Sequence, residues 1–305
     1  KMSVLERIAS ESMTPPLIIA EISANHGGSL DVMKEHISAA KETGADLVKI
    51  QTYTAESMTL DVKLEDFQIK HGKWSGSTLF DLYAAAETPL EWHDEIFSYA
   101  KTNGIELFAT PFDEAAVDFL EKFAPPGYKV ASFELTDWTL VEHICKQKRP
   151  VLMSTGMASL DEVERTSKIA LQHLSPHQLL LFHCVSEYPT NIAHSNLGMI
   201  KVVQDQFGVS VGLSDHTSGN TAAGAATALG VRAIEKHFII DRTINTPDSD
   251  FSATFDELSE LVRTVHDIYA SLNDTPWSRS MGEELNKQFR RSLYYGDDLC
   301  AGEIL

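Results

Sequence analysis

The chain has few cysteines, little positive charge and no long apolar runs, and each deficit excludes a class of protein. Its 305 residues include three cysteines without metal-type spacing, and their odd number favours reduced thiols in a cytoplasmic protein. Lysine and arginine number 25 against 44 aspartates and glutamates, so the net charge of −19 argues against binding to nucleic acid or an anionic membrane surface. No apolar run approaches the ~20 residues that span a bilayer, and the polar start predicts no signal peptide.

A nucleotide-binding fingerprint is also missing after the first expected strand, where Gly27-Gly28 alone indicates a turn. The remaining composition, 43% hydrophobic and 23% charged, is that of a globular protein. An anionic small molecule stays compatible with the acidic chain if local lysines, a metal and helix N-termini form one positive pocket.

What the chain does contain is a repeated alternation of strand and helix. Eight short apolar runs each end in a polar residue, and a helical pattern usually follows; this predicts an α/β protein, a closed (β/α)8 TIM barrel. The expected strands cover residues 17–23, 46–51, 105–110, 128–132, 150–154, 179–184, 209–214 and 231–238.

Length sets the expected domain organisation. A barrel of this kind typically takes about 250 residues. We therefore assign residues 1–285 to a catalytic barrel and 286–305 to a linker and the beginning of a second, incomplete domain, in which residues 290–305 predict a strand, a turn and another strand. The long connection from Thr52 to about Pro89 carries aromatic residues, Trp74 among them, and predicts an ordered lid.

Two lysines lie in strands that are otherwise apolar. Lys49 and Lys129 must each find an anion or extend the ammonium group to water. Reactive groups of such barrels collect at the C-terminal ends of the strands, so the two lysines together would hold a phosphate or carboxylate. Hydroxyl donors for the same anion are expected at further strand ends, from Thr110, Ser132, Ser154, Ser186 and Ser214.

Two histidines, His216 and His237, lie at or just past the ends of adjacent strands. Two such imidazoles can share one divalent metal and leave positions open for water and substrate. The alternative is that they are two unrelated members of the twelve histidines. Because side chains alternate along a strand, Glu235 shares a face with His237, and Lys236 is expected to be structural or at the surface.

Three carboxylates, Glu21, Glu134 and Asp248, complete the set of candidates. A carboxylate near a metal can bind hydroxyl groups or move protons. Each of the three is equally consistent with a helix cap or an ion-pair partner.

The chain resembles the nonulosonic acid synthases in motifs that run in order from about residue 17: AEISANHGGSL, VKIQTYT, ATPFD, YKVASFE, STGMAS, CVSEYPT, GLSDHTSG, IEKHF and PDSDFS. This family joins phosphoenolpyruvate to a six-carbon acetamido sugar and so forms a nine-carbon acid. Within the family, the segments KIQTYTAESMTL, FQIKHGKW and LYAAAETPLEWH resemble the branch that makes pseudaminic acid more than those that make sialic or legionaminic acid.

The resemblance implies roles for the residues named above. It implies a divalent metal (Mn²⁺, Mg²⁺ or Co²⁺) on His216 and His237, and contacts from Glu21, Glu134 and Asp248 to sugar or water. Ser186 stands where sialic acid synthases carry asparagine. The implied substrate-binding residues are Lys49, Gln51, Thr110, Lys129, Ser132, Ser154, Ser186, Tyr188, Ser214 and Glu235.

The resemblance also implies that residues 286–305 begin an antifreeze-like (SAF) domain, which reaches across a domain-swapped homodimer and contributes an arginine to the partner's sugar site. Two other interpretations stay open at this point. One is a barrel that binds ligand without turnover. The other is a metal-dependent pyruvate aldolase with a Schiff-base lysine, which the paired histidines and many hydroxyls disfavour.

Overall fold

The computed structural model describes residues 3–5, 7, 14–70, 74–272 and 277–304, and it divides the chain into two units. The first is Lys1–Ala270 and the second is Ser271–Leu305. In the described residues no helix is long and apolar enough to cross a membrane.

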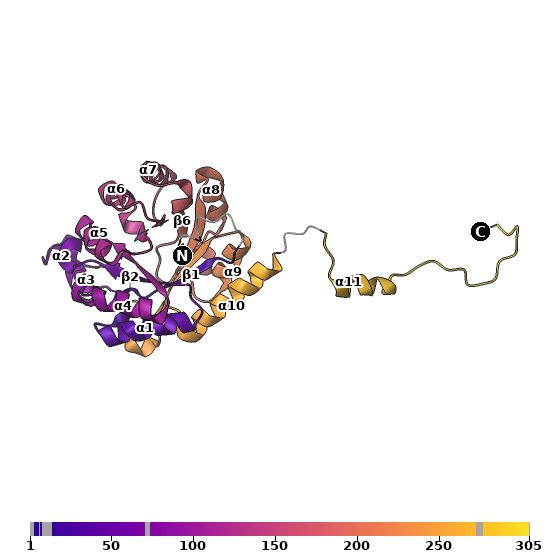
Figure 1. Ribbon diagram of the computed structural model, residues 1–305, viewed down its shortest axis with the longest axis horizontal. Helices are drawn as coiled ribbons and strands as arrows, with labels where there is room; N and C mark the ends of the chain where they lie inside the picture. Colours follow the sequence, from indigo (N-terminus) through magenta and orange to yellow (C-terminus); the bar gives the residue numbers. More distant parts are fainter. Residues whose placement is uncertain (1–2, 6, 8–13, 71–73, 273–276, 305) are drawn as a thin grey trace. The chain divides into compact units, whose positions relative to one another are not determined.

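The first unit is a closed barrel of eight parallel strands in sequential order, which confirms the predicted fold (Figure 1). The strands are β1 (Leu17–Glu21), β2 (Leu47–Thr52), β3 (Glu106–Pro111), β4 (Tyr128–Val130), β5 (Val151–Ser154), β6 (Leu179–Cys184), β7 (Ser210–Asp215) and β8 (Ala233–His237). Each begins and ends within two residues of its predicted range, because the apolar runs reflect burial on both faces of a parallel sheet.

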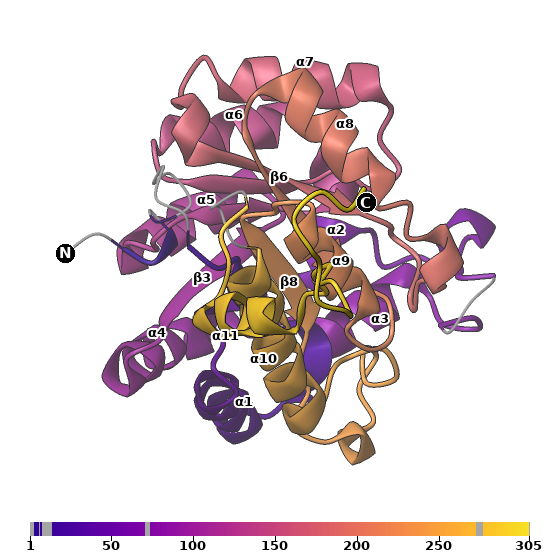
Figure 2. The same cartoon turned by 90° about the vertical axis from the view of Figure 1, so that its right-hand side faces the viewer.

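Helices surround the strands in the first unit (Figures 1 and 2). They are α1 (Leu30–Glu42), α2 (Ala55–Met58), α3 (Leu79–Ala86), α4 (His93–Asn103), α5 (Glu114–Leu120), α6 (Trp138–Lys146), α7 (Leu160–Ala170), α8 (Gly198–Phe207), α9 (Thr221–Ala228) and α10 (Phe255–Ser271). Ser159 and Glu162 form a capping box at the start of α7, so local sequence determines where that helix begins.

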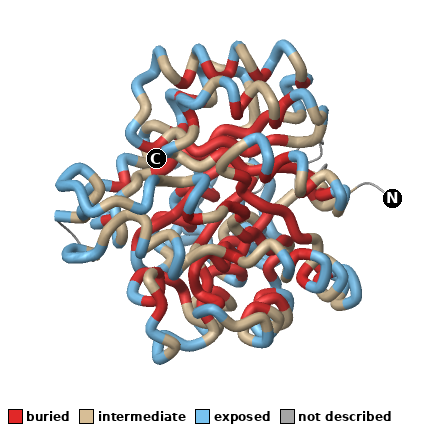
Figure 3. The backbone as a smooth tube through the Cα atoms, turned by 90° about the vertical axis from the view of Figure 1, so that its left-hand side faces the viewer, coloured by how far each residue is buried: buried red, intermediate tan, exposed pale blue. Residues whose placement is uncertain are grey.

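Alternation along each strand divides the apolar residues between two cores. Outward-facing residues such as Ile18 and Val48 pack against the surrounding helices. Buried residues gather in the middle of the barrel unit, along the strands and the inner sides of the helices (Figure 3). A smaller cluster fills the barrel interior, with Ile19, Phe108 and Phe182 among its members. The same inward-facing positions become polar toward the C-terminal end of each strand, so the interior core passes directly into the candidate site.

The second unit contains a short helix, α11 (Met281–Leu285), followed by a 3-10 turn over Asn286–Phe289. The strands predicted from residue 290 were wrong for the described residues, since 290–304 hold no strand, although the chain bends at 296–297, where the turn was expected. A strand needs a neighbour for its backbone hydrogen bonds, and alternating side chains alone do not provide one.

Candidate active site

The polar strand ends predicted to form a site do converge at one end of the barrel. Strand register brings Glu21 opposite both Lys49 and His237, and it pairs Gln51 with Thr110 and Ser214 with Glu235. All of these side chains belong to the inward-facing set of their strands. Closure of the barrel therefore gathers groups that are up to about two hundred residues apart in the sequence.

Lys49 is the centre of a buried charge network. Its Nζ lies 3.0 Å from Glu21 Oε2 and 3.6 Å from Glu235 Oε1, and it donates to Thr110 Oγ1 at 3.0 Å. Burial acts to lower the pKa of Lys49, but the two carboxylates outweigh it and raise that pKa. The ammonium group is therefore retained in the barrel beside two carboxylates, which is the first of the two outcomes expected for a lysine in an apolar strand.

The two carboxylates beside Lys49 differ in their protonation. Burial raises the pKa of the Glu21 carboxyl above its usual range, although Lys49 and a hydrogen bond from Gln51 oppose the shift. Burial acts in the same direction on Glu235, but the ammonium groups of Lys129 and Lys49 hold its pKa below the usual value. Glu21 is thus the carboxyl better suited to exchange a proton near neutral pH, and Glu235 the one that stays charged.

Lys129 provides the second cation of the site. Its Nζ donates to Ser154 Oγ at 2.7 Å and to the Val130 carbonyl at 3.0 Å, and it lies 4.0 Å from Glu235 Oε1. Burial lowers its pKa, against the opposing effect of Glu235. Lys129 has fewer anionic neighbours than Lys49, so an incoming anion would gain more from it.

Two serine hydroxyls of the site lie against Gly156. Gly156 N donates to Ser132 Oγ at 3.2 Å, and a methyl group at Gly156 would lie 2.3 Å from Ser186 Oγ and 2.7 Å from Ser132 Oγ. The absence of a side chain therefore lets the backbone approach both serines. Gly156 was not singled out from the sequence, and its role depends on contacts between three strand ends.

The two candidate metal ligands lie together, with ring centroids 5.4 Å apart. The His216 Nδ1 atom is 2.8 Å from the Val185 carbonyl, which directs the other ring nitrogen away from it. His237 Nδ1 is buried without a hydrogen-bond partner, and burial with nearby cations keeps the His237 pKa well below its usual value. A neutral imidazole with an unused nitrogen fits a divalent cation.

A cation at this position would be bound by few protein groups. Among the described residues no cluster of three or more histidine, cysteine, aspartate or glutamate side chains could hold a metal. Two imidazoles would leave coordination positions for water and substrate, which is the pattern of a catalytic rather than a structural site. Tyr188 lies over this pair, with its ring centroid 4.3 Å from that of His216.

The remaining predicted carboxylates are Asp248, which lies beside His237, and Glu134, whose carboxyl is influenced by the charge of Lys129. Asp248 Oδ2 is 3.7 Å from His237 Nδ1 and accepts from the Ala24 amide at 3.4 Å. Glu134 follows β4, and burial raises its pKa to about 7. Its Oε2 atom is buried without a hydrogen-bond partner, so Glu134 is available for contact with a ligand.

The long connection after β2 reaches the barrel mouth, as predicted for an ordered lid. Trp74 donates its indole N–H to the Pro247 carbonyl at 3.3 Å, and its ring centroid is 6.5 Å from that of Tyr188. Trp74 therefore joins the connection to the segment that carries Asp248. Residues 71–73 of the connection lie outside the described residues.

Cys184 is a further group in the mouth that the sequence analysis did not place in the site. Its Sγ atom lies 3.9 Å from His216 Nδ1 and accepts from Ser132 Oγ at 3.5 Å. Burial acts to raise the pKa of this thiol, but His216 outweighs it and holds the pKa at about 7. The end of an apolar strand was the only sequence signal for this position.

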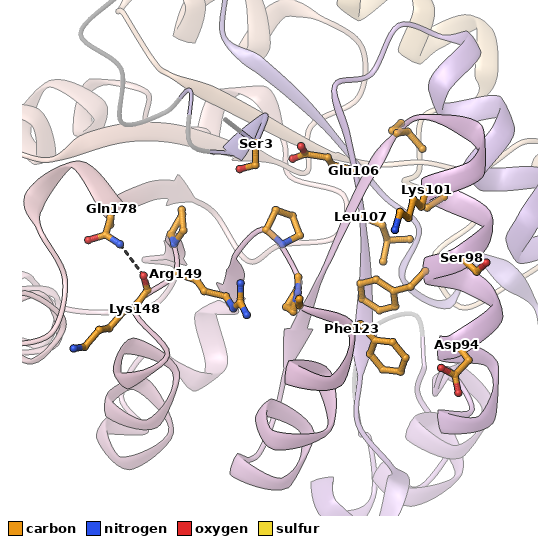
Figure 4. Close-up of a pocket in the computed structure, with 17 residues that line it drawn as sticks. Ser3, Asp94, Ser98, Lys101, Glu106, Leu107, Phe123, Lys148, Arg149 and Gln178 are labelled. Carbon is orange, nitrogen blue, oxygen red and sulfur yellow. Dashed lines mark hydrogen bonds between the residues drawn. The ribbon is translucent and has the colours of Figure 1, made fainter. Parts of the chain in front are cut away.

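A cavity of about 780 Å³ lies elsewhere in the barrel unit (Figure 4). It is lined by Glu106 and Leu107 at the start of β3, by Arg149 before β5, and by residues of α4 such as Lys101. These are the N-terminal ends of strands, opposite the converging polar groups. None of the predicted site residues lines this cavity, so we do not assign the chemistry to it.

The fold and site define a (β/α)8 barrel protein whose mouth holds two buried lysines, paired imidazoles and three or more carboxylates. The chain belongs to the NeuB family, because the sequence model of that family matches residues 36–276.

Relatives with similar sequences include pseudaminic and legionaminic acid synthases. The chain is 44% identical over 287 residues to the pseudaminic acid synthase of Campylobacter jejuni, covering 94% of this chain and 83% of that one. It is 38% identical over 294 residues to the pseudaminic acid synthase of Helicobacter pylori, covering 96% and 86%. It is 34% identical over 295 residues to the N,N'-diacetyllegionaminic acid synthase of Campylobacter jejuni, covering 96% and 88%.

A solved structure shares both fold and sequence with this chain. The N-acetylneuraminic acid synthetase of Leptospira borgpetersenii, in complex with citrate, superposes with a TM-score of 0.80 at 29% identity, and the match covers 92% of this chain and 93% of that one.

Proposed function

We propose that this chain is a pseudaminic acid synthase. It condenses phosphoenolpyruvate with 2,4-diacetamido-2,4,6-trideoxy-L-altrose and water, and it releases pseudaminic acid and phosphate. The observation that carries the proposal is the convergence of Lys49, Lys129 and the surrounding hydroxyls beside His216 and His237. The identity to the Campylobacter and Helicobacter enzymes favours the pseudaminic branch over the legionaminic and sialic branches.

The anionic substrate would be held by the lysine side of the mouth. Lys129 and Lys49 neutralise the phosphate and carboxylate of phosphoenolpyruvate, and the hydroxyls of Ser132, Ser154 and Ser186 donate to the same oxygens. A positive pocket of this kind lets a chain of strongly negative net charge bind an anion.

The sugar would lie on the histidine side, where the open-chain aldehyde meets the alkene carbon of phosphoenolpyruvate. A divalent cation held by His216 and His237 would supply Lewis-acid polarisation of the aldehyde oxygen. Glu21, Glu134 and Asp248 orient the hydroxyls and the water, and Glu21 and Glu134 have pKa values suited to proton exchange. A new C–C bond forms, water adds to the pyruvyl carbon, and C–O cleavage releases phosphate.

Product analysis tests this proposal. The protein is incubated with phosphoenolpyruvate, a divalent metal and each of several acetamido sugars, and products are identified by mass spectrometry together with phosphate release. Pseudaminic acid from the altrose-type sugar supports the proposal, whereas sialic or legionaminic acid as the preferred product overturns the branch. Binding without phosphate release would indicate a ligand-binding barrel, and a borohydride-trapped pyruvate adduct would indicate an aldolase.

The metal, the homodimer, the antifreeze-like domain and the cytoplasmic location stay predictions. We include the divalent metal and a homodimer in the proposal, since the paired imidazoles suit a cation and the family resemblance implies a shared sugar site.

The first prediction concerns the glycine beside the serines. Gly156→Ala should lower kcat/KM for phosphoenolpyruvate by between about 10- and 100-fold, because its methyl group would displace Ser132 and Ser186 from the anion. Steady-state kinetics with each substrate varied in turn provides the measurement. The control is Gly198→Ala, where the added methyl group meets nothing within 4 Å. If kcat/KM for phosphoenolpyruvate were unchanged in Gly156→Ala, Ser132 and Ser186 would not belong to the anion site.

The second prediction concerns the connection across the mouth. Trp74→Phe should raise the KM of the sugar by about 2- to 10-fold and leave that of phosphoenolpyruvate unchanged, since one hydrogen bond to the Pro247 carbonyl is lost. Trp138→Phe is the matched control, because the Trp138 indole nitrogen has no hydrogen-bond partner. A selective rise in the phosphoenolpyruvate constant would contradict the placement of the sugar near Asp248.

A further inference from the structure

A buried ion pair joins the ends of β7 and β8 on the face opposite the candidate site. Asp215 and Lys236 are register partners, and Lys236 Nζ lies 2.7 Å from Asp215 Oδ2. Each residue is only 3% exposed. Lys236 was predicted to be structural or at the surface, and the structural interpretation is the one that its burial and contacts confirm. The pair lies behind the mouth, between the strands and the helices.

This ion pair holds the chain on both sides of His216. Asp215 Oδ1 accepts from the Thr217 amide at 2.9 Å and from the Thr217 hydroxyl at 2.7 Å, and Lys236 Nζ also donates to the Thr217 carbonyl. The residue before His216 and the residue after it are therefore held by the same cluster. The Thr190 amide donates to the His216 carbonyl at 2.9 Å and completes the support of that backbone.

The same lysine directly precedes His237. Because successive side chains of a strand point to opposite faces, fixing Lys236 outward fixes the direction in which His237 points inward. The His237 ring packs edge-on against Phe251, with centroids 5.0 Å apart, but its Nδ1 atom has no hydrogen-bond partner that would fix the ring by itself. Its direction therefore depends on the strand end that Lys236 holds.

Stability alone is a weak reason for such a pair. Replacing a buried ion pair by apolar residues of similar volume is often neutral or stabilising, because desolvation of two charges offsets their attraction. The geometry supplies a different reason. A single contact connects the two residues that stand immediately before the two imidazoles.

We propose that Asp215 and Lys236 are positioning residues that set the separation and direction of the His216 and His237 rings, and thereby the affinity of the site for a divalent cation. The inference rests on the metal site of the proposed function. Both side chains lie on the outward face of their strands, away from the imidazoles. Their effect passes through the backbone of the two strand ends.

The test measures cobalt binding by the full chain, without substrates. Co²⁺ is titrated into metal-free protein, and its visible absorption reports both the dissociation constant and the coordination. Lys236→Met and Asp215→Asn should each weaken binding by about 10- to 100-fold and alter the spectrum, the size expected when a group that orients a metal ligand is removed. Thermal unfolding is measured in parallel.

The double variant Asp215→Asn/Lys236→Met separates positioning from folding. Neither charge is then left buried and unpaired, so the thermal midpoint should recover relative to the single variants. The connection between the strand ends is still missing, so cobalt binding should stay weak. Recovery of cobalt affinity together with stability would overturn the inference.

The ion pair of Arg149 with Glu121 provides the matched control. Arg149 Nε lies 2.8 Å from Glu121 Oε1, before β5 and at the other end of the strands. Arg149→Met should leave the dissociation constant for Co²⁺ unchanged. If Arg149→Met weakened cobalt binding as much as Lys236→Met does, the loss of any ion pair would impair the site, and the inference would be overturned. If the unsubstituted chain bound no cobalt, the metal part of the proposed function and this inference would both fall. If all variants bound like the unsubstituted chain, only the inference would fall.

Discussion

His237→Ala should lower turnover by about 1,000-fold or more while the barrel stays folded, because Lewis-acid stabilisation of a developing charge supplies several kcal/mol. His237 is at the end of β8, and its side chain contributes an imidazole rather than core packing. Chelation of the unsubstituted protein should give a similar loss, and added Mn²⁺, Co²⁺ or Mg²⁺ should restore the rate. Phosphate release after dialysis against chelator is the measurement.

His183→Ala is the control for that variant. His183 is also buried in a strand, but its Nε2 atom lies 2.7 Å from the Ser195 carbonyl and outside the converging group. Its replacement should lower the thermal midpoint and leave metal-dependent turnover in place. A rate that survives exhaustive chelation would mean that His216 and His237 bind substrate without a metal.

Lys129→Ala should raise the KM of phosphoenolpyruvate by about 10- to 100-fold, since a charged hydrogen bond to an anion contributes roughly 1.5–3 kcal/mol. The KM of the sugar should change far less, because Lys129 lies among the hydroxyls rather than beside the imidazoles. Kinetics with each substrate varied at saturation of the other distinguishes the two constants. A change confined to the sugar constant would show that Lys129 has been assigned to the wrong substrate.

The pH dependence gives an independent check on the same lysine. Burial lowers the Lys129 pKa, so its ammonium form is lost at a lower pH than for an exposed lysine as the pH rises. Only the ammonium form attracts the anion. The value of kcat/KM for phosphoenolpyruvate should therefore fall on the alkaline side of its profile, and Lys129→Ala should lack that fall.

Much of the site was predictable because its residues carry local signals. A lysine within an apolar strand, such as Lys49, was expected to find an anion or to extend to water, and Glu21 and Glu235 are the anions that it finds. His216 and His237 were expected to lie close together because they end adjacent strands, and their ring centroids are 5.4 Å apart, whereas the metal between them stays a prediction. The strands predicted from residue 290 onward were wrong for the described residues, because a strand forms only where a neighbour accepts and donates its backbone hydrogen bonds.

Other features carried no local signal. Gly156 resembles any loop glycine until Ser132 and Ser186 are brought against it. Asp215 and Lys236 are ordinary charged residues in sequence, yet they form a buried connection between two strand ends. Trp74 was expected in an ordered lid, but nothing in the sequence indicated its hydrogen-bond acceptor, the Pro247 carbonyl, which is 173 positions away.

The sequence by itself determined the strands, the order in which they alternate with helices, and which polar residues end them, because burial and side-chain alternation impose periods that a single segment reveals. Only the tertiary structure decided which of those residues meet. Distances between strand ends depend on the register of all eight strands and on closure of the barrel, and no segment contains that information alone. The pKa values of Glu21 and Glu235 also depend on barrel closure, since both end apolar strands and differ in the charges and hydrogen-bond donors that the barrel places beside them.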